Sequence, residues 1–335
     1  MTIVTRVSKG SQLAWTDLDG NFTDLDGRVT VLSYGYRNKI INGAMLVDQR
    51  NAGAAQSVPN AVRTYTLDRY AVTTAGAGVT TQQTSSGVGT LPAQFTNVLK
   101  ITGTTGNTAC TVDQRIESGN ALRLASQVCQ IAAAIYTDTA FTPTYTINSA
   151  NAVDNFSSTT LVTSGSFGPV GAGAYTRVFA TVTLNAACLN GVEFQINLGP
   201  IANGSVRALV GVSFEYGTVL LPYPTRLLQE DQFLCDRYFK QTSSDFTGWA
   251  ASATAAYLEY AHDGVFRVAP TVTLPSTGFT NALSEFGVAT RTPTALALMS
   301  ASKQAVMVKA TGAASMTANN GVGWVGPAIQ MSAEL

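Results

Sequence analysis

Few side chains of this sequence could take part in catalysis. One of them is the single histidine, His262. A Ser–His–Asp triad would have to use this residue, and no serine stands in the sequence context of a nucleophile. One histidine also excludes a metal centre built from several histidines of one subunit. The 20 Asp and Glu residues could include a pair that hydrolyses glycosides, but the sequence gives no separation between them. We therefore assign no catalytic residue.

Two sequence motifs resemble ligand-binding loops but do not meet the structural requirements of such loops. Residues 321–326 read Gly-Val-Gly-Trp-Val-Gly, the spacing of a dinucleotide-binding turn. The sequence beyond them has no room for the helix and second strand that such a site needs. Asp17-Leu-Asp-Gly and Asp24-Leu-Asp-Gly offer acidic pairs, but the glycine comes too early for a calcium loop and Phe22 stands in its place. We predict no metal and no cofactor.

The residues after position 245 have the best local supply of the aromatic and polar side chains that recognition of a sugar would need. A sugar ring stacks on an aromatic side chain, and its hydroxyls bond to carboxylates, amides or hydroxyls. The candidate binding residues are Trp249, Tyr257, Glu259, Tyr260, His262, Asp263 and Trp324. In a strand, Tyr257 and Glu259 would share one face, with Tyr260 and His262 on the other. Core packing or a subunit interface is the alternative for both tryptophans, and an ordinary strand or turn position is the alternative for His262.

Strands must position these residues, because alternation with period two dominates after residue 60. Residues 178–184, 192–198 and 206–216 alternate in this way. Residues 127–136 are small and apolar on both faces, which predicts a central strand covered on both sides. Clusters of Gly, Ser, Thr, Asn and Pro separate the runs. The pattern predicts a mostly β chain with an antiparallel β-sandwich or jelly roll.

A smaller β domain is expected to follow the sandwich. Prolines within residues 220–224 end a strand, because proline cannot donate to a ladder. Residues 226–234 could form one or two helical turns, and new strand patterns cover residues 266–274 and 305–310. The predicted domains are an N-terminal attachment segment over residues 1–36, the sandwich over residues 37–228 and the C-terminal β domain over residues 229–335.

Composition narrows the class of protein further. Of 335 residues only 12% are charged, with 20 Lys and Arg against 20 Asp and Glu. This balance excludes a large basic footprint for nucleic acid. No apolar run is long enough to span a membrane, and the first residues lack the apolar core of a signal peptide. The four cysteines are expected to be buried thiols, although a Cys110–Cys129 bridge stays open.

The first 35 residues contain a seven-residue repeat with an apolar seam. Residues 16–22 and 23–29 repeat Thr-Asp-Leu-Asp-Gly, and the apolar residues recur at steps of three and four. The seam consists of Trp15, Leu18, Phe22, Leu25, Val29 and Leu32. Such a pattern is typical of helices that pack on one another. We expect a short helix that forms against copies of itself or a docking partner, the alternative being one amphipathic helix packed on its own domain.

Three stretches resemble segments of tailed-bacteriophage tail-fibre proteins. Residues 4–25, with the run Ser-Gln-Leu-Ala-Trp-Thr-Asp-Leu, resemble the N-terminal segment of many such proteins. Residues 41–53 (Ile-Asn-Gly-Ala-Met-Leu-Val-Asp-Gln-Arg-Asn-Ala-Gly) and 65–70 (Tyr-Thr-Leu-Asp-Arg-Tyr) resemble the opening of a jelly-roll module. Residues 214–224 and 229–239 resemble its close and the start of a C-terminal β domain.

The resemblance implies a noncatalytic virion protein, a tail-fibre or receptor-binding subunit of the phage tail that is assembled in the host cytoplasm. It would be a homotrimer attached to other tail proteins through its N-terminus. Its jelly roll would be carbohydrate-binding in shape, and its partner would be a bacterial surface glycan or outer-membrane receptor. Nucleic acid and membrane insertion are not expected. The alternatives are a structural connector that holds another fibre, or a glycan-degrading tail enzyme.

The opening of the resembling module also carries a compact polar set. It includes Asp48, Arg50, Asp68 and Arg69. These positions look structural, and we expect an ion pair between Arg50 and Asp68 or between Asp48 and Arg69.

Overall fold

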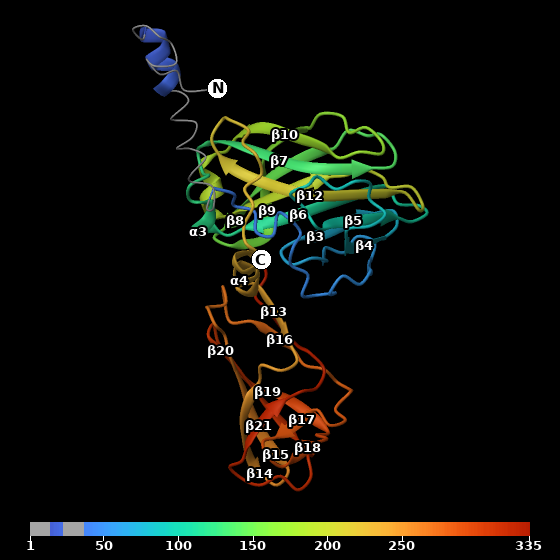
Figure 1. The fold of residues 1–335 in the computed structure, drawn as a ribbon, viewed down its shortest axis with the longest axis vertical. Coiled ribbons are helices and arrows are strands. Elements are labelled where there is room, and N and C mark those ends of the chain that lie inside the picture. The colour runs from blue at the N-terminus through green and yellow to red at the C-terminus, as the bar shows by residue number, and fades with distance from the viewer. Residues whose placement is uncertain (1–13, 23–36) are drawn as a thin grey trace.

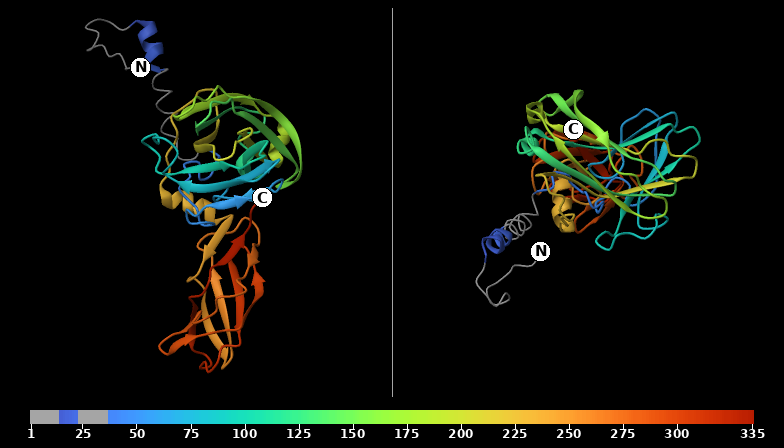
Figure 2. Two further views of the ribbon diagram at one scale, coloured as in Figure 1. Left: turned by 90° about the vertical axis from the view of Figure 1, so that its right-hand side faces the viewer. Right: turned by 90° about the horizontal axis from the view of Figure 1, so that it is seen from above.

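The computed structural model describes residues 14–22 and 37–335, and within them the chain is mostly β (Figure 1). Two six-stranded antiparallel sheets form a sandwich, as the alternation predicts. A smaller C-terminal part holds a three-stranded and a seven-stranded sheet. Figure 2 shows that its strands extend lengthwise away from the sandwich.

The first sheet of the sandwich has the order β1 (Gln56–Val58), β4 (Val79–Thr84), β5 (Val98–Gly103), β12 (Val206–Tyr216), β7 (Val128–Thr137), β10 (Thr176–Thr183). The second sheet has the order β2 (Thr64–Tyr65), β3 (Ala71–Ala75), β6 (Ala109–Ile116), β11 (Val192–Asn197), β8 (Thr144–Ala152), β9 (Asn155–Ser166). Short helical turns, α3 (Ser118–Ala121) and the 3₁₀ turn η2 (Ala186–Asn190), connect strands of the two sheets.

The C-terminal part begins after helix α4 (Leu228–Asp236). Its three-stranded sheet has the order β13 (Phe239–Thr242), β22 (Ile329–Ser332), β16 (Thr271–Thr273). Its seven-stranded sheet has the order β18 (Ala289–Arg291), β17 (Leu283–Glu285), β21 (Gly321–Trp324), β14 (Thr247–Ser252), β15 (Ala255–Ala261), β20 (Ala305–Thr311), β19 (Ala295–Ala301). The strand predicted over residues 266–274 is thus reduced to β16.

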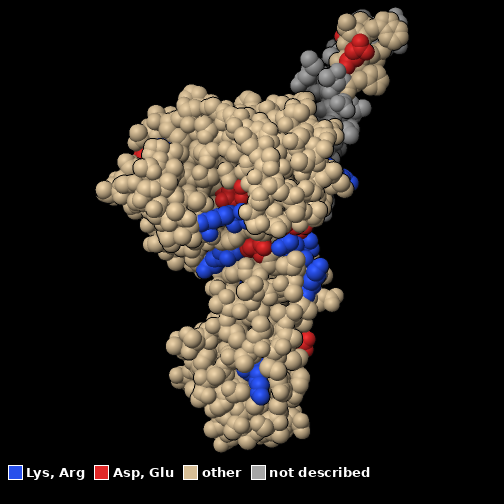
Figure 3. Space-filling view, turned by 180° about the vertical axis from the view of Figure 1, so that it is seen from behind, with Lys and Arg blue, Asp and Glu red and all other residues tan. Residues whose placement is uncertain are grey.

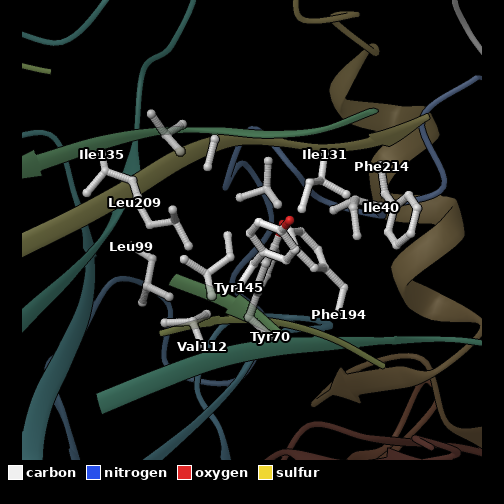
Figure 4. Packing of buried hydrophobic residues seen from close by; sticks show 14 of the residues in the cluster. Ile40, Tyr70, Leu99, Val112, Ile131, Ile135, Tyr145, Phe194, Leu209 and Phe214 are labelled. Carbon is white, nitrogen blue, oxygen red and sulfur yellow. The ribbon is translucent and has the colours of Figure 1, made fainter. Parts of the chain in front are cut away.

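The core of the sandwich lies between its two sheets. Alternate residues of the strands point inward, so that Ile131 of β7 lies on the side of Phe194 and Phe214, while Ile135 lies farther along with Leu209 and Leu99 (Figure 4). The rings of Phe194 and Phe214 pack edge to face with centroids 5.5 Å apart. Strand β7 lies between β12 and β10, and Ala132 on its outer face is also buried, in agreement with the prediction of a strand covered on both sides.

Two further findings concern the cysteines and the helices. Cys110, Cys129, Cys188 and Cys235 are all free and buried, so Cys110 and Cys129 form no bridge. Across residues 14–22 and 37–335, every helix is too short or too polar to cross a membrane.

A helix over residues 15–22 carries the first half of the predicted seam. Its first turn is stabilised where the Asp17 carboxylate accepts the backbone N–H of Ala14 at 2.8 Å. Trp15 and Phe22 are 82% and 68% exposed, so neither ring packs on the β domains of its own chain. The remaining seam residues, Leu25, Val29 and Leu32, lie outside the described residues.

The sandwich and the C-terminal part meet through an apolar cluster. Ile41 and Val47 of the sandwich pack with Cys235 of α4 and with Tyr238, which follows α4. Asp231 of α4 accepts the backbone N–H of Asn42 at 3.3 Å. Helix α4 is therefore built into the joint between the two parts.

The ion pairs expected within residues 48–69 are replaced by pairs across this joint. Arg50 lies 2.7 Å from Glu334, and Arg69 binds the other oxygen of the same carboxylate. Asp68 instead accepts hydrogen bonds from Gln49. The sequence expectation was wrong because Glu334 comes from the far end of the chain, where no local pattern connects it to these arginines.

Candidate functional site

A pair of partly exposed aromatic rings lies on the outer face of the seven-stranded sheet. Trp249 of β14 stands directly opposite Tyr257 of β15, and their ring centroids are 5.8 Å apart. Trp249 is 42% exposed. It lies within strand β14. The two rings form a partly exposed apolar surface on this face of the sheet.

Phe286 extends this surface, and the sequence analysis missed it. The register places Trp249 opposite Gly321 of β21. A methyl group added at Gly321 would lie 2.8 Å from the Phe286 ring, and one at Gly323 would lie 3.1 Å from it. Phe286 therefore lies flat over both glycines beside Trp249, and its ring is 54% exposed. The two glycines were the available signal, because a strand lacking side chains on one face leaves space for a ring.

Polar groups border the aromatic rings. The ammonium group of Lys309 lies 5.7 Å from the Tyr257 ring centroid, and Lys309 stands opposite Tyr257 in the ladder. Glu259 shares the face of Tyr257, as predicted, and stands opposite Thr247. We call Trp249, Tyr257, Glu259, Phe286 and Lys309 the aromatic face. It offers rings to the apolar side of a sugar, and a carboxylate and an ammonium to its hydroxyls.

Glu285 holds the strand that presents Phe286. This carboxylate is buried and accepts hydrogen bonds from the backbone of Thr317 at 2.7 Å and from the side chain of Asn320 at 3.1 Å. Arg291 donates two more bonds to it, at 2.7 and 2.9 Å. The backbone bond from Thr317 and the bonds from Arg291 lower the pKa of Glu285 to about 2.

We expect Glu285 to make the C-terminal domain sensitive to acid. Its pKa is lower in the folded than in the unfolded chain, so its stabilisation is complete above the unfolded pKa near 4.5 and is lost as pH falls toward 2. Thermal unfolding of Glu285→Gln should show a smaller fall in melting temperature across this window than the parent chain shows. Exposed Glu259→Gln serves as the control and should keep the parental slope. An unchanged slope in Glu285→Gln would contradict this role.

Tyr260, His262 and Asp263 form a separate group from the aromatic face. With Phe233 and Asp236 of α4 they line a cavity of about 300 Å³ at the joint. The Nδ1 atom of His262 accepts the backbone N–H of Gly264 at 2.9 Å, so Nε2 carries the proton and donates to the Asp236 carbonyl at 3.0 Å. Both ring nitrogens are thus hydrogen-bonded within the protein. His262 therefore stabilises the joint, whereas the sequence analysis predicted that it binds a ligand.

Trp324 requires a correction, because it belongs to the core. Its exposed fraction is 0%, its indole N–H donates to the Pro327 carbonyl at 2.9 Å, and its ring meets Phe279 at 6.0 Å. A surface ligand has no access to this ring. Core packing, the alternative considered for both tryptophans, holds for Trp324.

The outer face of the second sheet carries paired charges. Arg63 lies 2.6 Å from Asp113, and Arg115 lies 2.8 Å from Glu193. Glu193 also accepts a hydrogen bond from Gln195 at 2.9 Å. Figure 3 shows that charged side chains gather around a hollow in the sandwich and along the joint, while the rest of that view is almost uncharged. Within the described residues, no cluster of three metal-ligating side chains is present.

The sequence matches no family profile and no curated protein. Solved structures are similar over about half of this chain. A candidate sugar-binding protein from Bacteroides thetaiotaomicron is 16% identical, with a TM-score of 0.37 over 54% of this chain and 100% of its own. The enzymatically active domain of tailspike protein 4 from bacteriophage CBA120 is 15% identical, with a TM-score of 0.34 over 54% of this chain and 22% of its own. A family 4 carbohydrate-binding module is 12% identical, with a TM-score of 0.33 over 52% of this chain and 98% of its own. At these scores, no ligand is assigned to this chain from its neighbours.

Proposed function

We propose that this protein is a noncatalytic subunit of a phage tail fibre that binds a bacterial surface glycan through the aromatic face. The observation that carries the glycan part is the pair of exposed Trp249 and half-buried Tyr257, with ring centroids 5.8 Å apart and bordered by Lys309. Two adjacent rings on a rigid sheet match the apolar side of a sugar chain and lose little conformational entropy on binding. Binding of this kind makes and breaks no covalent bond.

The tail-fibre part of the proposal is supported by the resemblance of the N-terminal segment and of residues 41–53. The exposed rings of Trp15 and Phe22 fit a segment that docks on other tail proteins or on copies of itself in a homotrimer. Several copies acting together would turn weak single contacts into firm attachment. The protein would act within the virion.

Trp249→Ala is expected to weaken glycan binding about tenfold per site, because loss of one stacked ring removes about 1.4 kcal/mol. The melting temperature should change little, since the ring is 42% exposed. Binding would be measured on an array of bacterial lipopolysaccharides and capsular polysaccharides. Tyr216→Ala, which removes a 57% exposed ring from the sandwich, is the matched control and should bind like the parent chain.

The same array separates the other candidate functions. Unchanged binding by Trp249→Ala, or its unfolding, would contradict the role of the aromatic face. No binding by the parent chain, together with a stable complex with another tail protein, would identify a structural connector. New reducing ends in a bound polysaccharide would identify an enzyme.

A further inference from the structure

The cavity of about 300 Å³ at the joint lies between helix α4 and the end of strand β15. Figure 1 shows α4 between the sandwich and the rest of the C-terminal part. From α4 the cavity is lined by Gln232, Phe233 and Asp236. From β15 and the turn after it, the cavity is lined by Tyr260, His262 and Asp263. None of these residues belongs to the aromatic face, so a ligand held here would occupy a second site.

The Phe233 ring forms an aromatic wall that is fixed in place. A methyl group added at Gly264 would lie 3.1 Å from this ring, so the ring lies against the backbone of the turn after β15. The same turn is held by the hydrogen bond from the Gly264 N–H to His262 at 2.9 Å. Phe233 is nevertheless 60% exposed. A positioned ring therefore offers accessible apolar surface to a ligand.

The Tyr260 hydroxyl is a polar group without a partner in this cavity. Tyr260 is 4% exposed, and its ring packs on Phe246 with centroids 5.5 Å apart. Within residues 14–22 and 37–335 its hydroxyl forms no hydrogen bond, and it is not one of the enclosed polar atoms that lack a partner there. The hydroxyl therefore keeps accessible surface.

Electrostatics locates this hydroxyl at the acidic side of the cavity. Burial, and then the carboxylates of Asp236 and Asp263, raise the pKa of Tyr260. Both acids line the cavity, so the hydroxyl lies near them on the cavity side of its ring. It can donate a hydrogen bond to a ligand atom or accept one from it.

Asp263 supplies a carboxylate that the protein itself leaves unpaired. Among the described residues that line the cavity, two are acids and none is Lys or Arg. Asp236 is paired with Lys240 at 2.9 Å and accepts a hydrogen bond from Gln232 at 2.6 Å. Asp263 is exposed and forms no ion pair within the described part of the chain. The cavity therefore favours a ligand that carries a positive charge.

We propose that this cavity binds an amino sugar in its ammonium form. The ammonium group donates to the Asp263 carboxylate, and the apolar side of the sugar ring stacks on Phe233. The Tyr260 hydroxyl forms a hydrogen bond with a hydroxyl of the sugar. The volume is at the small end of ligand pockets and suits a single sugar residue. The site is separate from the aromatic face, and it does not depend on a role in a phage tail.

The test uses the intact protein with three probes: glucosamine, N-acetylglucosamine and ethanolamine. N-acetylglucosamine keeps the sugar ring without the charge, and ethanolamine keeps the amine without the ring. Binding is measured by titration calorimetry and saturation-transfer NMR at about pH 6, where the amines are protonated. We expect glucosamine to bind in the millimolar range and each of the other probes to bind at least about tenfold more weakly.

Three variants test the three contacts. Asp263→Asn removes the charge and Phe233→Leu removes the ring, and each should weaken glucosamine binding by about tenfold or abolish it. Tyr260→Phe keeps the buried ring and removes the hydroxyl, and it should weaken binding by about threefold or more. Melting temperatures should show that every variant is folded.

Glu230→Gln is the matched control. Glu230 is an exposed acid on α4 that does not line the cavity, and glutamine keeps an acceptor for the backbone N–H of Leu227. The variant loses one negative charge close to the site without touching it. It should bind glucosamine within about twofold of the parent chain, because exposed charges outside the site are screened.

Several results would overturn the proposal. They are absence of glucosamine binding, equal binding of N-acetylglucosamine, and full glucosamine binding by Asp263→Asn and Phe233→Leu. Ethanolamine binding as tight as that of glucosamine would overturn the assignment to a sugar. Binding of polysaccharide through Trp249 is measured independently on the array, so failure of one site is distinguishable from failure of the other.

Discussion

Trp324→Ala is expected to lower the free energy of unfolding of the C-terminal domain by about 3–5 kcal/mol, the usual cost of deleting a buried aromatic side chain. The ring has no exposed surface, and it packs in one cluster with Phe246 and Leu283. Its indole N–H is bound to Pro327, so truncation also leaves that carbonyl without its donor. The loss should appear in calorimetry as an early transition of the C-terminal part, with the sandwich transition little affected.

Trp249→Ala provides the comparison, because it deletes the same side chain from the surface of the same domain. We expect its stability to change by less than about 1 kcal/mol. Fluorescence quenching by iodide offers a second readout, since Trp324 is shielded and Trp249 is not. Equal stability losses in the two variants would contradict the division into a core tryptophan and a binding tryptophan.

Glu334→Gln is expected to weaken the joint between the sandwich and the C-terminal part by about 3–5 kcal/mol, because it leaves buried charge without a counterion. Arg69 is 1% exposed, binds Glu334, and stacks on Tyr238 with its guanidinium 3.6 Å from the ring centroid. Arg50 shares the same carboxylate and stacks on Phe239 at 3.7 Å. The Arg69 guanidinium cannot reach water without breaking these contacts, whereas the Arg50 side chain is 14% exposed.

Limited proteolysis and small-angle scattering would detect this change. The Glu334→Gln chain should be cut faster between α4 and β13 and should show a broader range of shapes in solution, while both parts keep their folds. Glu259→Gln, an exposed acid in the same part of the chain, should behave like the parent. A rigid, protease-resistant Glu334→Gln chain would show that the apolar cluster around Cys235 alone holds the joint.

The sandwich could be predicted from sequence where its strands have one buried face. Residues 192–198 and 206–216 alternate strictly, and they correspond to β11 and β12. The strand predicted over residues 266–274 failed for a physical reason. Phe266 is buried in the core, but the chain around it bends, and only Thr271–Thr273 pair with β22. Alternation of apolar and polar residues indicates which side chains are buried. A buried side chain can also belong to a segment that forms no β-ladder.

The candidate site could be predicted only in part. Tyr257 and Glu259 share a face as the spacing of two requires, because that relation lies within one strand. The meeting of Trp249 with Phe286 depends on the register between distant strands, which no local pattern specifies. Trp324 has the same local signals as an exposed loop tryptophan, and only the packing of Phe279 and Ala282 around it distinguishes the two cases.

The return of β22 to the joint has a mechanical consequence. Strand β13 leaves the joint and β22 comes back to it, and the two are paired from Phe239 to Thr242. A load applied at the far end of the C-terminal part is therefore carried by two adjacent backbones and the ladder between them. A single connecting strand could rotate about its backbone bonds, whereas two hydrogen-bonded strands resist bending and twisting. The C-terminal part is therefore expected to keep a fixed orientation relative to the sandwich.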